Sequence, residues 1–361
     1  MIKESRKILI CTHDYPPDNG GIAAFARDLN VLFSNMGYEV KIHQQKTSEN
    51  TLHPILNFVR TFADLWNKII SGQYDLVLAT RILPFGLLSL LISPFIKSKI
   101  IIQVHGTEIT GRFNKGWRKS LLKFSYNRVN QIWANSLNTE ERLINFGVKK
   151  NKIKLVYPFL TNDISKISTG KSLPQNNKIR LLTAGTLYPR KGIDLVLKAL
   201  SNLKHLEWEY ILIGQSPLGY KNVYPQLAQN LGIEDRVKFL GQVNRQTVWK
   251  QMLAADLFVL PSREVHDDIE SFGIVYIEAQ YFGTPCIGTQ TGGIPEAIGD
   301  GGYLIENENI EQLEYLLKLL ITDEKKRRKL AENSRHRIEN SFTMAKRTEE
   351  IKNYLGILSI L

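Results

Sequence analysis

The chain has few of the residues that build covalently or metal-stabilised folds. Its 361 residues include only two cysteines, Cys11 and Cys286, which are far apart and belong to no CxxC pair or Cys/His cluster. This spacing excludes a disulfide scaffold and offers no set of metal ligands. We therefore expect free thiols, no metal site and a reducing intracellular compartment.

The sequence also lacks a hydrophobic run long enough to cross a bilayer. The longest uncharged apolar stretch, "ILPFGLLSLLISPFI" at residues 82–96, is shorter than the ~20 residues that a spanning helix needs and contains two prolines. We favour a helix buried against a sheet over an interfacial membrane helix. The short run "ILIC" near the N-terminus suits a buried first strand better than a secretion signal.

Acidic residues are scarce in the first half alone. Residues 1–160 hold 22 Lys/Arg against 11 Asp/Glu, whereas residues 161–361 hold 25 against 24, so nearly all of the net charge of +12 lies in the first half. This asymmetry predicts an anionic partner: a membrane surface, a phosphorylated substrate or nucleic acid. Since no helix-turn-helix, finger or RNA-binding motif accompanies it, we expect no nucleic acid.

Short β-like runs alternate with amphipathic helical segments along the whole chain. This alternation predicts an α/β fold class with parallel sheets that are covered on both faces. We expect two doubly wound, Rossmann-like domains that face each other across a cleft lined by the carboxyl ends of their strands. The predicted strands span residues 7–12, 39–44, 75–80, 99–104, 131–135, 153–157, 179–185, 208–214, 236–241, 256–261, 285–289 and 302–305.

A polar stretch separates the two halves. The segment "KISTGKSLPQNNK" at residues 166–178 has the composition of a linker. It predicts one domain over residues 1–170 and a second over residues 178–342. The charged tail from about residue 310 reads as helices with a solvated face, and residues 343–361 are predicted to form a C-terminal helix that packs back on the first domain.

Two turns of the second half place small and cationic residues at the ends of predicted strands. In "AGTLYPRKGID", at residues 184–194, Gly185 ends a strand, and Arg190 and Lys191 come just before a helix. Adjacent cations at such a turn are suited to phosphate oxygens, although a solvated loop is the alternative. The next strand ends at Gly214, so both turns meet at one rim.

The stretch "ESFGIVYIE" at residues 270–278 brackets an apolar segment with two glutamates. Ser271 is the predicted N-cap of a helix that begins at Phe272 or Gly273, whose free amides and dipole favour a diphosphate. Both carboxylates could then accept hydrogen bonds from sugar hydroxyls. The alternatives are that the first carboxylate stabilises the helix dipole and that Glu278 forms a salt bridge.

Together "GTLYPRKGID", "PSREVHDDIESFGIVYIEAQYFGTPCIG" and "TGGIPE" resemble the donor-binding domain of the retaining GT-B glycosyltransferases of family 4, also called glycosyl transferases group 1. "YPPDNGGIAAFARDL" and "VHGTE" extend the resemblance to the first half. The resemblance implies a GT-B architecture with an N-terminal acceptor-binding domain and a C-terminal nucleotide-sugar-binding domain. It implies a retaining, metal-independent hexosyltransferase that takes a sugar from a UDP- or GDP-type donor, with no further cofactor.

The resemblance implies a role for each residue of this chain that matches a motif position of the family. Glu270 would contact hydroxyls of the transferred sugar, Glu278 the nucleoside ribose and Lys191 the diphosphate, while His105 lies near the reacting sugar. Thr186 stands where the family often has arginine, so we assign the second cation to Arg190. The implied catalytic set is His105, Arg190, Lys191 and Glu270, and the implied donor-binding set is Gly20, Gly21, Gly185, Gly214, Ser271, Phe272, Gly273, Ile274 and Glu278.

The expected chemistry centres on the leaving phosphate. Cations and helix amides would stabilise the charge that develops on it, in place of a metal ion. Retention would follow from a front-face substitution in which the leaving phosphate accepts the acceptor's proton and His105 orients the substrate. The stretch "HDD" at residues 266–268 is interpreted as loop polarity and not as a metal site.

The acceptor side is inferred from one basic and aromatic stretch. Residues 97–128 hold eight Lys/Arg against Glu108 alone, interleaved with aromatic rings. This mixture suits the surface of an anionic membrane, and a solvated helix packed by its aromatic rings is the alternative. The predicted acceptor or membrane surface consists of Arg112, Lys115, Trp117, Arg118, Lys119 and Lys123.

These features predict a cytoplasmic protein peripherally associated with the inner face of the cell membrane. Its partners would be a nucleotide sugar and a glycan or lipid-linked acceptor of the cell envelope, as in polysaccharide or lipopolysaccharide biosynthesis. Two alternatives stay open: a sugar-nucleotide epimerase of GT-B shape and a catalytically dead scaffold that binds sugar nucleotides.

Overall fold

The computed structural model describes residues 6–16, 20–44, 54–109, 115–167, 178–265 and 268–360. The chain forms two compact units, the first from Met1–Thr161 with Met344–Leu361 and the second from Asn162–Thr343. All twelve predicted strands are present, with bounds that differ by at most two residues from those predicted. Most of the predicted linker, residues 168–177, lies outside the described residues.

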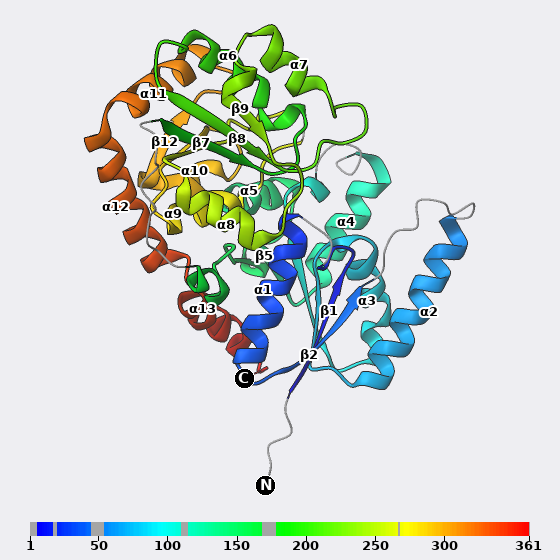
Figure 1. Ribbon diagram of the computed structural model, residues 1–361. Coiled ribbons are helices and arrows are strands. Elements are labelled where there is room, and N and C mark those ends of the chain that lie inside the picture. The colour runs from blue at the N-terminus through cyan, green and yellow to red at the C-terminus, as the bar shows by residue number, and fades with distance from the viewer. Residues whose placement is uncertain are drawn as a thin grey trace. The chain divides into compact units, whose positions relative to one another are not determined.

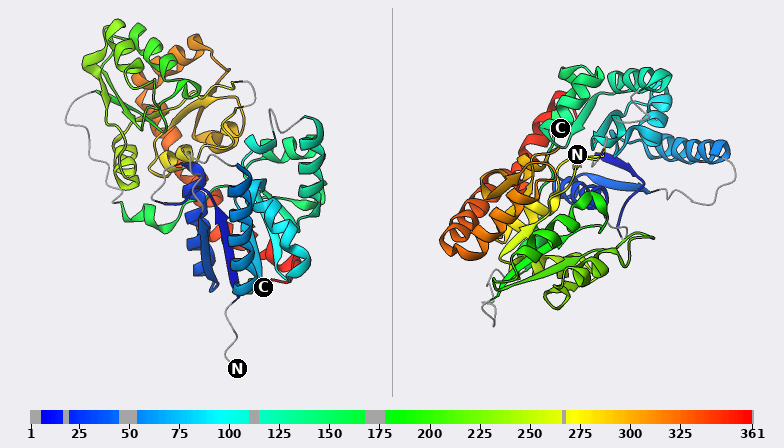
Figure 2. Two further views of the ribbon diagram at one scale, coloured as in Figure 1. Left: turned by 90° about the vertical axis from the view of Figure 1, so that its right-hand side faces the viewer. Right: turned by 90° about the horizontal axis from the view of Figure 1, so that it is seen from above.

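The first unit is built on a six-stranded parallel sheet with the strand order β2-β1-β3-β4-β5-β6. Helices lie on both sides of the sheet (Figures 1 and 2), which confirms the predicted α/β class. Its strands are β1 (Lys7–Thr12), β2 (Glu39–Gln44), β3 (Leu76–Ala79), β4 (Lys99–Val104), β5 (Gln131–Ala134) and β6 (Ile153–Leu155). Its helices are α1 (Gly21–Asn35), α2 (Pro54–Gly72), α3 (Leu87–Ile92), α4 (Gly116–Arg128), α5 (Leu137–Phe146) and α13 (Met344–Ile357).

Alternate residues of each strand in this sheet supply two separate cores. In β1, Leu9 and Cys11 belong to a buried cluster with residues of α2, α3 and α4. Ile8 and Ile10 face the other way, into a cluster with residues of α1 and α13. This two-residue alternation is what a sheet covered on both faces requires.

Six residues of the segment at 82–96 are buried and six are half-buried, so the predicted burial is confirmed in part. It forms a short helical turn at Ile82–Gly86, then α3 and a further turn at Ser93–Phe95. Its buried side chains join the cluster under α2 and α4, whereas Leu91 and Phe95 are exposed. Among the described residues, no helix is long and apolar enough to cross a membrane.

Helix α13 belongs to the first unit although it follows the second in sequence. Ile351 and Leu355 are fully buried in the cluster that α1 completes, and Figure 1 shows α13 in red beside α1 in blue. Gln131 of β5 donates a hydrogen bond to the carbonyl of Tyr354 at 2.9 Å. The last helix therefore supplies part of the core of the first unit.

The second unit contains another six-stranded parallel sheet, with the order β12-β11-β10-β7-β8-β9. Its strands are β7 (Ile179–Ala184), β8 (Trp208–Ile213), β9 (Val237–Phe239), β10 (Leu257–Val259), β11 (Cys286–Thr289) and β12 (Gly302–Ile305). Its helices are α6 (Ile193–Asn202), α7 (Val223–Asn230), α8 (Arg245–Ala254), α9 (Ile274–Tyr281), α10 (Ile294–Ile298), α11 (Ile310–Thr322) and α12 (Glu324–Ser341). In α12 only Leu330, Ser334 and Ile338 are buried, so its charge run is solvated as predicted.

Each strand order reverses at one point, between β1 and β3 in the first unit and between β7 and β10 in the second. Ligands of open parallel sheets bind at the carboxyl ends of the strands that flank such a reversal. Gly20 and Gly21 lie after β1. Arg190 and Lys191 lie after β7, and Glu270 lies after β10. Most of the predicted site residues thus follow the four strands that flank the two reversals.

We predict that truncating Ile351 destabilises the first unit far more than truncating Ile357 of the same helix. Ile351 is fully buried, whereas Ile357 is 66% exposed. Ile351→Ala should lower the free energy of unfolding by about 2–5 kcal/mol and Ile357→Ala by no more than about 0.5 kcal/mol. Urea unfolding followed by circular dichroism measures both. Equal effects would mean that α13 does not complete this core.

Candidate functional site

Turns at the carboxyl rim of the second sheet approach so closely that only glycine fits. Gly192, just after the two cations, has φ +67°, and a Cβ there would lie 2.1 Å from the carbonyl oxygen of Pro261. Gly292 has φ +57°, and its Cβ would lie 2.1 Å from the carbonyl oxygen of Glu270. Gly192 allows the loops after β7 and β10 to meet at the strand reversal, and Gly292 allows the loop after β11 to contact the loop after β10.

Gly185 and Gly214 hold the neighbouring turns together in the same way. A Cβ at Gly214, where φ is +144°, would lie 1.7 Å from the carbonyl oxygen of Gly185. The amide of Gly185 donates to the carbonyl of Ile213 at 2.9 Å. Close packing thus explains Gly214. A Cβ at Gly185 would meet only Lys191 Cε, at 3.9 Å, so this glycine is explained by its backbone conformation, with φ +148°. Contact of either glycine with a donor stays a prediction. Thr186, beside them, is exposed.

Glu270 lies between the two predicted cations. Its Oε2 accepts hydrogen bonds from Arg190 Nη1 at 3.2 Å and from Lys191 Nζ. All three side chains are largely buried. Burial alone would raise the pKa of Glu270, but the charges of Lys191 and Arg190 outweigh it and lower the pKa to about 2. The cluster therefore contains a firmly ionised carboxylate and carries a net positive charge.

Arg190 has two further partners that the sequence did not single out. Its Nε donates to Tyr188 Oη at 2.7 Å and lies 3.2 Å from Asp268 Oδ2. Burial alone would lower the pKa of Arg190, but Glu270 and these partners outweigh it and raise the pKa. Arg190 is therefore a permanent cation beside Lys191. Its assignment as the second cation, in a chain that has Thr186 where the family often has arginine, requires this charge.

Arg263 fixes the loop that carries the two cations. Its guanidinium makes two hydrogen bonds of 2.7 Å to the carboxylate of Asp194, in the first turn of α6, and Nη1 also donates to the carbonyl of Pro189 at 2.8 Å. Its amide donates to the carbonyl of Arg190 at 2.6 Å. Arg263 was not predicted from the sequence, because the local motif "PSREV" does not indicate a partner 69 positions away.

The start of α9 differs from the prediction. The helix begins at Ile274 with Gly273 as its N-cap, and no side chain caps it, so the prediction of Ser271 as N-cap is wrong. The reason is the left-handed backbone of Gly273, with φ +84°, where a Cβ would clash with the ring of Tyr276 at 2.6 Å. Phe272 is buried against Phe342, so only its backbone can serve a ligand.

Glu278, in the second turn of α9, forms the salt bridge that the sequence left open as an alternative. Its side chain is 5% exposed, and its Oε1 lies 2.7 Å from Nη2 of Arg245. Trp249 Nε1 also donates to Oε1, at 3.0 Å. Both partners belong to α8, and neither was predicted. The second glutamate is thus held at the same rim by a cation and an indole N–H.

The predicted residues of the first unit also lie at a carboxyl rim. Gly20, with φ +137°, is the N-cap of α1, and a Cβ at Gly20 or Gly21 would meet none of the described atoms within 4 Å. His105 follows β4 and is buried. Burial, with a smaller contribution from Arg81, lowers the pKa of His105 to about 3. At neutral pH His105 is therefore an uncharged imidazole.

The predicted basic surface is present on α4, except for Arg112, which lies outside the described residues. Trp117 is 71% exposed and Phe124 59% exposed, and only Leu122, Ser125 and Tyr126 of this helix are buried. The remaining members of the predicted surface are Lys115, Trp117, Arg118, Lys119 and Lys123. Trp117 and Phe124 thus lie at the surface, whereas Tyr126 is buried with its ring near that of Phe146, so the aromatic residues of α4 divide between surface and core.

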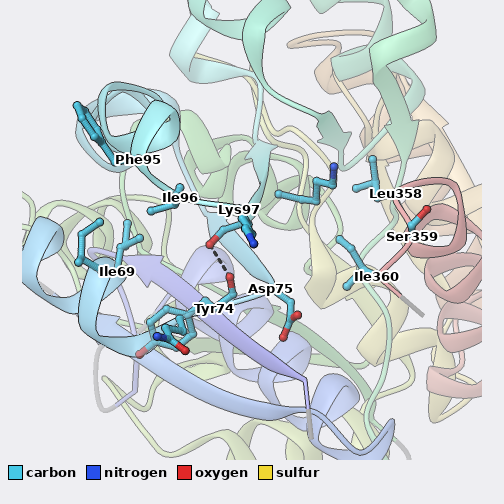
Figure 3. A pocket seen from close by; sticks show the side chains of 13 residues that line it. Ile69, Tyr74, Asp75, Phe95, Ile96, Lys97, Leu358, Ser359 and Ile360 are labelled. Atoms are coloured by element: carbon cyan, nitrogen blue, oxygen red, sulfur yellow. Dashed lines mark hydrogen bonds between the residues drawn. The ribbon is translucent and has the colours of Figure 1, made fainter. Parts of the chain in front are cut away.

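A cavity of about 550 Å³ lies in the first unit, at the opposite end of the sheet from its carboxyl rim. Figure 3 shows that Tyr74, Asp75 and Lys97 line it together with the C-terminal residues Leu358 and Ile360. Because β3 and β4 begin here, this cavity is separate from the predicted site residues.

No group of three or more His, Cys, Asp or Glu side chains that could hold a metal ion occurs within the described ranges. Of the "HDD" stretch, His266 and Asp267 lie outside those ranges, and Asp268 pairs with Arg190. Cys11 and Cys286 are buried free thiols in different units.

We predict that His105 makes the stability of the protein depend on pH. The pKa of His105 is about 3 in the fold and has an ordinary value of 6.5 when exposed, so the unfolded chain binds more protons between these values. As the pH falls from 6 to 4, wild type should lose about 1 kcal/mol per pH unit relative to His105→Gln. Urea unfolding at several pH values tests this, and parallel curves would contradict it.

Solved structures share this fold along nearly the whole chain. Anabaena HepE in complex with UDP and glucose has a TM-score of 0.76 at 20% identity, covering 97% of this chain and 99% of that one. A glycosyltransferase from Rickettsia africae has a TM-score of 0.79 at 18% identity, covering 99% of both chains. These likenesses confirm the GT-B fold, with its two parallel sheets flanked by helices.

Curated relatives also match over most of their length. N-acetyl-alpha-D-glucosaminyl L-malate synthase of Bacillus anthracis is 26% identical over 91% of this chain and 92% of that protein. GDP-mannose-dependent monoacylated alpha-(1-6)-phosphatidylinositol monomannoside mannosyltransferase of Corynebacterium glutamicum is 27% identical over 97% and 98%. The model of Glycosyltransferase Family 4 matches residues 19–162, and that of Glycosyl transferases group 1 matches residues 165–337. The chain is therefore a glycosyltransferase of family 4, group 1.

Proposed function

We propose that this glycosyltransferase moves a sugar, with retention of anomeric configuration and without a metal ion, from a nucleoside diphosphate sugar to a hydroxyl of a cell-envelope acceptor. The acceptor is a glycan or a lipid-linked glycan. The observation that carries the proposal is the cluster of Arg190, Lys191 and Glu270 at the strand reversal of the second sheet. Two cations and one carboxylate suit a ligand with both phosphate oxygens and sugar hydroxyls.

The cations of this cluster would serve the leaving group. In a front-face substitution the acceptor oxygen forms a bond to the anomeric carbon as the bond from that carbon to the diphosphate oxygen breaks. The acceptor's proton passes to the leaving diphosphate, on the same face of the sugar. Arg190 and Lys191 would stabilise the charge on that diphosphate, which is the task of a metal ion in other transferases.

Glu270 would bind hydroxyls of the transferred sugar. Its low pKa keeps it an acceptor of hydrogen bonds throughout the neutral range. Its Oε2 is already shared by both cations, so sugar and phosphate sites would be neighbours. In the first unit, the uncharged His105 would orient a substrate as a hydrogen-bonding group, since a pKa of about 3 makes it a poor general base at neutral pH.

The relatives support the donor class, and one of them supports a lipid-linked acceptor. One is named a GDP-mannose-dependent mannosyltransferase of a phosphatidylinositol mannoside and another a glucosaminyl malate synthase. HepE is described in complexes with UDP, glucose and UDP-glucose. Acceptors therefore vary widely among similar proteins, whereas nucleoside diphosphate sugars recur.

We predict that one nucleotide sugar stabilises the protein in the presence of EDTA and that Lys191→Met abolishes this effect. A donor at 100 times its Kd should add about 2.7 kcal/mol to the free energy of unfolding. A thermal-shift screen of UDP-, GDP- and ADP-sugars, followed by calorimetry, measures it. Lys198→Met is the matched control, because Lys198 lies in the same unit with its side chain 49% exposed.

The outcomes separate the proposal from its rivals. Stabilisation that survives Lys191→Met or requires a divalent cation would contradict the proposed site. Conversion of the donor to its epimer with no acceptor present would identify an epimerase. Donor binding without transfer to any glycan or lipid acceptor would leave a sugar-nucleotide-binding scaffold.

We further propose that α4 attaches the protein to the inner face of the cell membrane. Exposed Trp117 and Phe124 supply rings for the headgroup region, and Arg118, Lys119 and Lys123 supply charge for anionic lipids. Arg118 and Arg128 lie over exposed rings at 5.6 and 5.3 Å, so cations and rings share one surface. This surface belongs to the unit to which the family pattern assigns the acceptor.

We predict binding to vesicles that contain anionic lipid, weakened by salt and by Trp117→Ser. Salt screens the attraction of the lysines and arginines, and loss of the indole removes an interfacial anchor. Co-sedimentation at low and high salt measures both effects. Tyr315→Ser is the control, since Tyr315 is a similarly exposed ring of the second unit. Equal affinity for neutral vesicles would argue against this surface.

A further inference from the structure

The two carboxylate oxygens of Glu278 have different hydrogen-bond partners. Oε1 accepts hydrogen bonds from Arg245 Nε at 2.9 Å and from Trp249 Nε1 at 3.0 Å, and Arg245 Nη2 lies 2.7 Å from it as an ion-pair partner. Within the part of the chain that the structure describes, no group donates to Oε2. The two donors and the guanidinium charge thus gather at one oxygen and leave the other with its full capacity to accept.

The two donors are themselves held in place. Arg245 is the first residue of α8, and Trp249 lies one turn later, so their side chains are neighbours on the helix surface. The guanidinium of Arg245 lies over the ring of Trp249, 4.9 Å from its centroid. Trp249 is buried. The stacked pair therefore donates its N–H groups to Glu278 from fixed positions, which restricts rotation of the carboxylate.

Glu278, Arg245 and Trp249 lie near the carboxyl rim of the second sheet. Helix α8 follows β9, and α9 follows β10, so each helix begins at the carboxyl ends of the strands. Glu278 is the fifth residue of α9, counted from Ile274. Its side chain is almost fully buried, and a buried carboxylate stays ionised only if cations and donors hold it. Arg245 supplies the cation.

We infer that Arg245 and Trp249 are positioning residues that hold Glu278 by Oε1, so that Oε2 alone is presented to a ribose hydroxyl of the donor nucleotide. This inference rests on the proposed function, since it takes a nucleoside diphosphate as the ligand of the rim. A ligand hydroxyl gains most from an acceptor that is ionised and already oriented. Neither residue needs to touch the ligand for this effect.

The inference is tested by how well the protein distinguishes a ribose from a sugar without hydroxyls. The probes are UDP and GDP with their 2′,3′-dideoxy forms, and the readout is the ratio of the two Kd values from calorimetry. In wild type the ribonucleotide should bind about 10-fold more tightly, as one hydrogen bond to a charged acceptor provides. Arg245→Met and Glu278→Gln should both reduce this ratio to about 2-fold or less, while the dideoxy form binds as before.

Further variants separate positioning from general support of the fold. Trp249→Phe keeps the ring under Arg245 and removes only one donor, so it should reduce the ratio less than Arg245→Met does. In a Glu278→Gln background, Arg245→Met should cause no further change. The matched control is Arg236→Met, because Arg236 lies over Trp208 at 5.3 Å in the same unit and donates to the carbonyl of Leu206, away from any carboxylate.

Three results would overturn the inference in distinguishable ways. If Arg245→Met weakens both forms of the nucleotide equally, Arg245 supports the fold and does not position Glu278. If Glu278→Gln leaves the ratio unchanged while UDP or GDP still binds, Oε2 does not receive the ribose, and the proposed function stands without it. If none of UDP, GDP and ADP binds wild type, the proposed function itself fails.

Discussion

Glu270 and the two cations that share its Oε2 form the interaction on which the rim of the second unit depends. The three charges are largely buried, and such charges persist only when they neutralise one another. They also join the loop after β7 to the loop after β10, a junction that Gly192 and Arg263 reinforce. The carboxylate of Glu270 lies between the two cations, beside the position that we propose for a diphosphate.

The two glutamates of "ESFGIVYIE" have related but different environments. Each is held by an arginine from another element, Arg190 for Glu270 and Arg245 for Glu278. Glu270 lies in a loop and shares one oxygen with an arginine and a lysine, whereas Glu278 lies in a helix and is held by a stacked arginine and tryptophan. The two carboxylates of one short motif are thus fixed by different elements of the second unit.

Much of the fold could be predicted from local pattern, because buried parallel strands are short apolar runs with turn residues after them. The same reasoning identified Lys191, Glu270 and Glu278, whose residue types and spacing are recognisable. It failed at Ser271, since the left-handed backbone of Gly273 resets the helix start. Arg263 and Arg245 could not be found this way, because their roles arise from partners 69 and 33 positions away that only the folded chain brings together.

Because α13 returns to the first unit, the second unit is an insertion within the chain of the first. The ribosome therefore completes all of the second unit before it makes Ile351 and Leu355, which the core of the first unit needs. The second unit is free to fold during synthesis, while the first, begun earlier, is finished last. Until then, the core that α1 shares with the sheet lacks the two side chains that α13 contributes, and this part of the first unit stays incompletely packed.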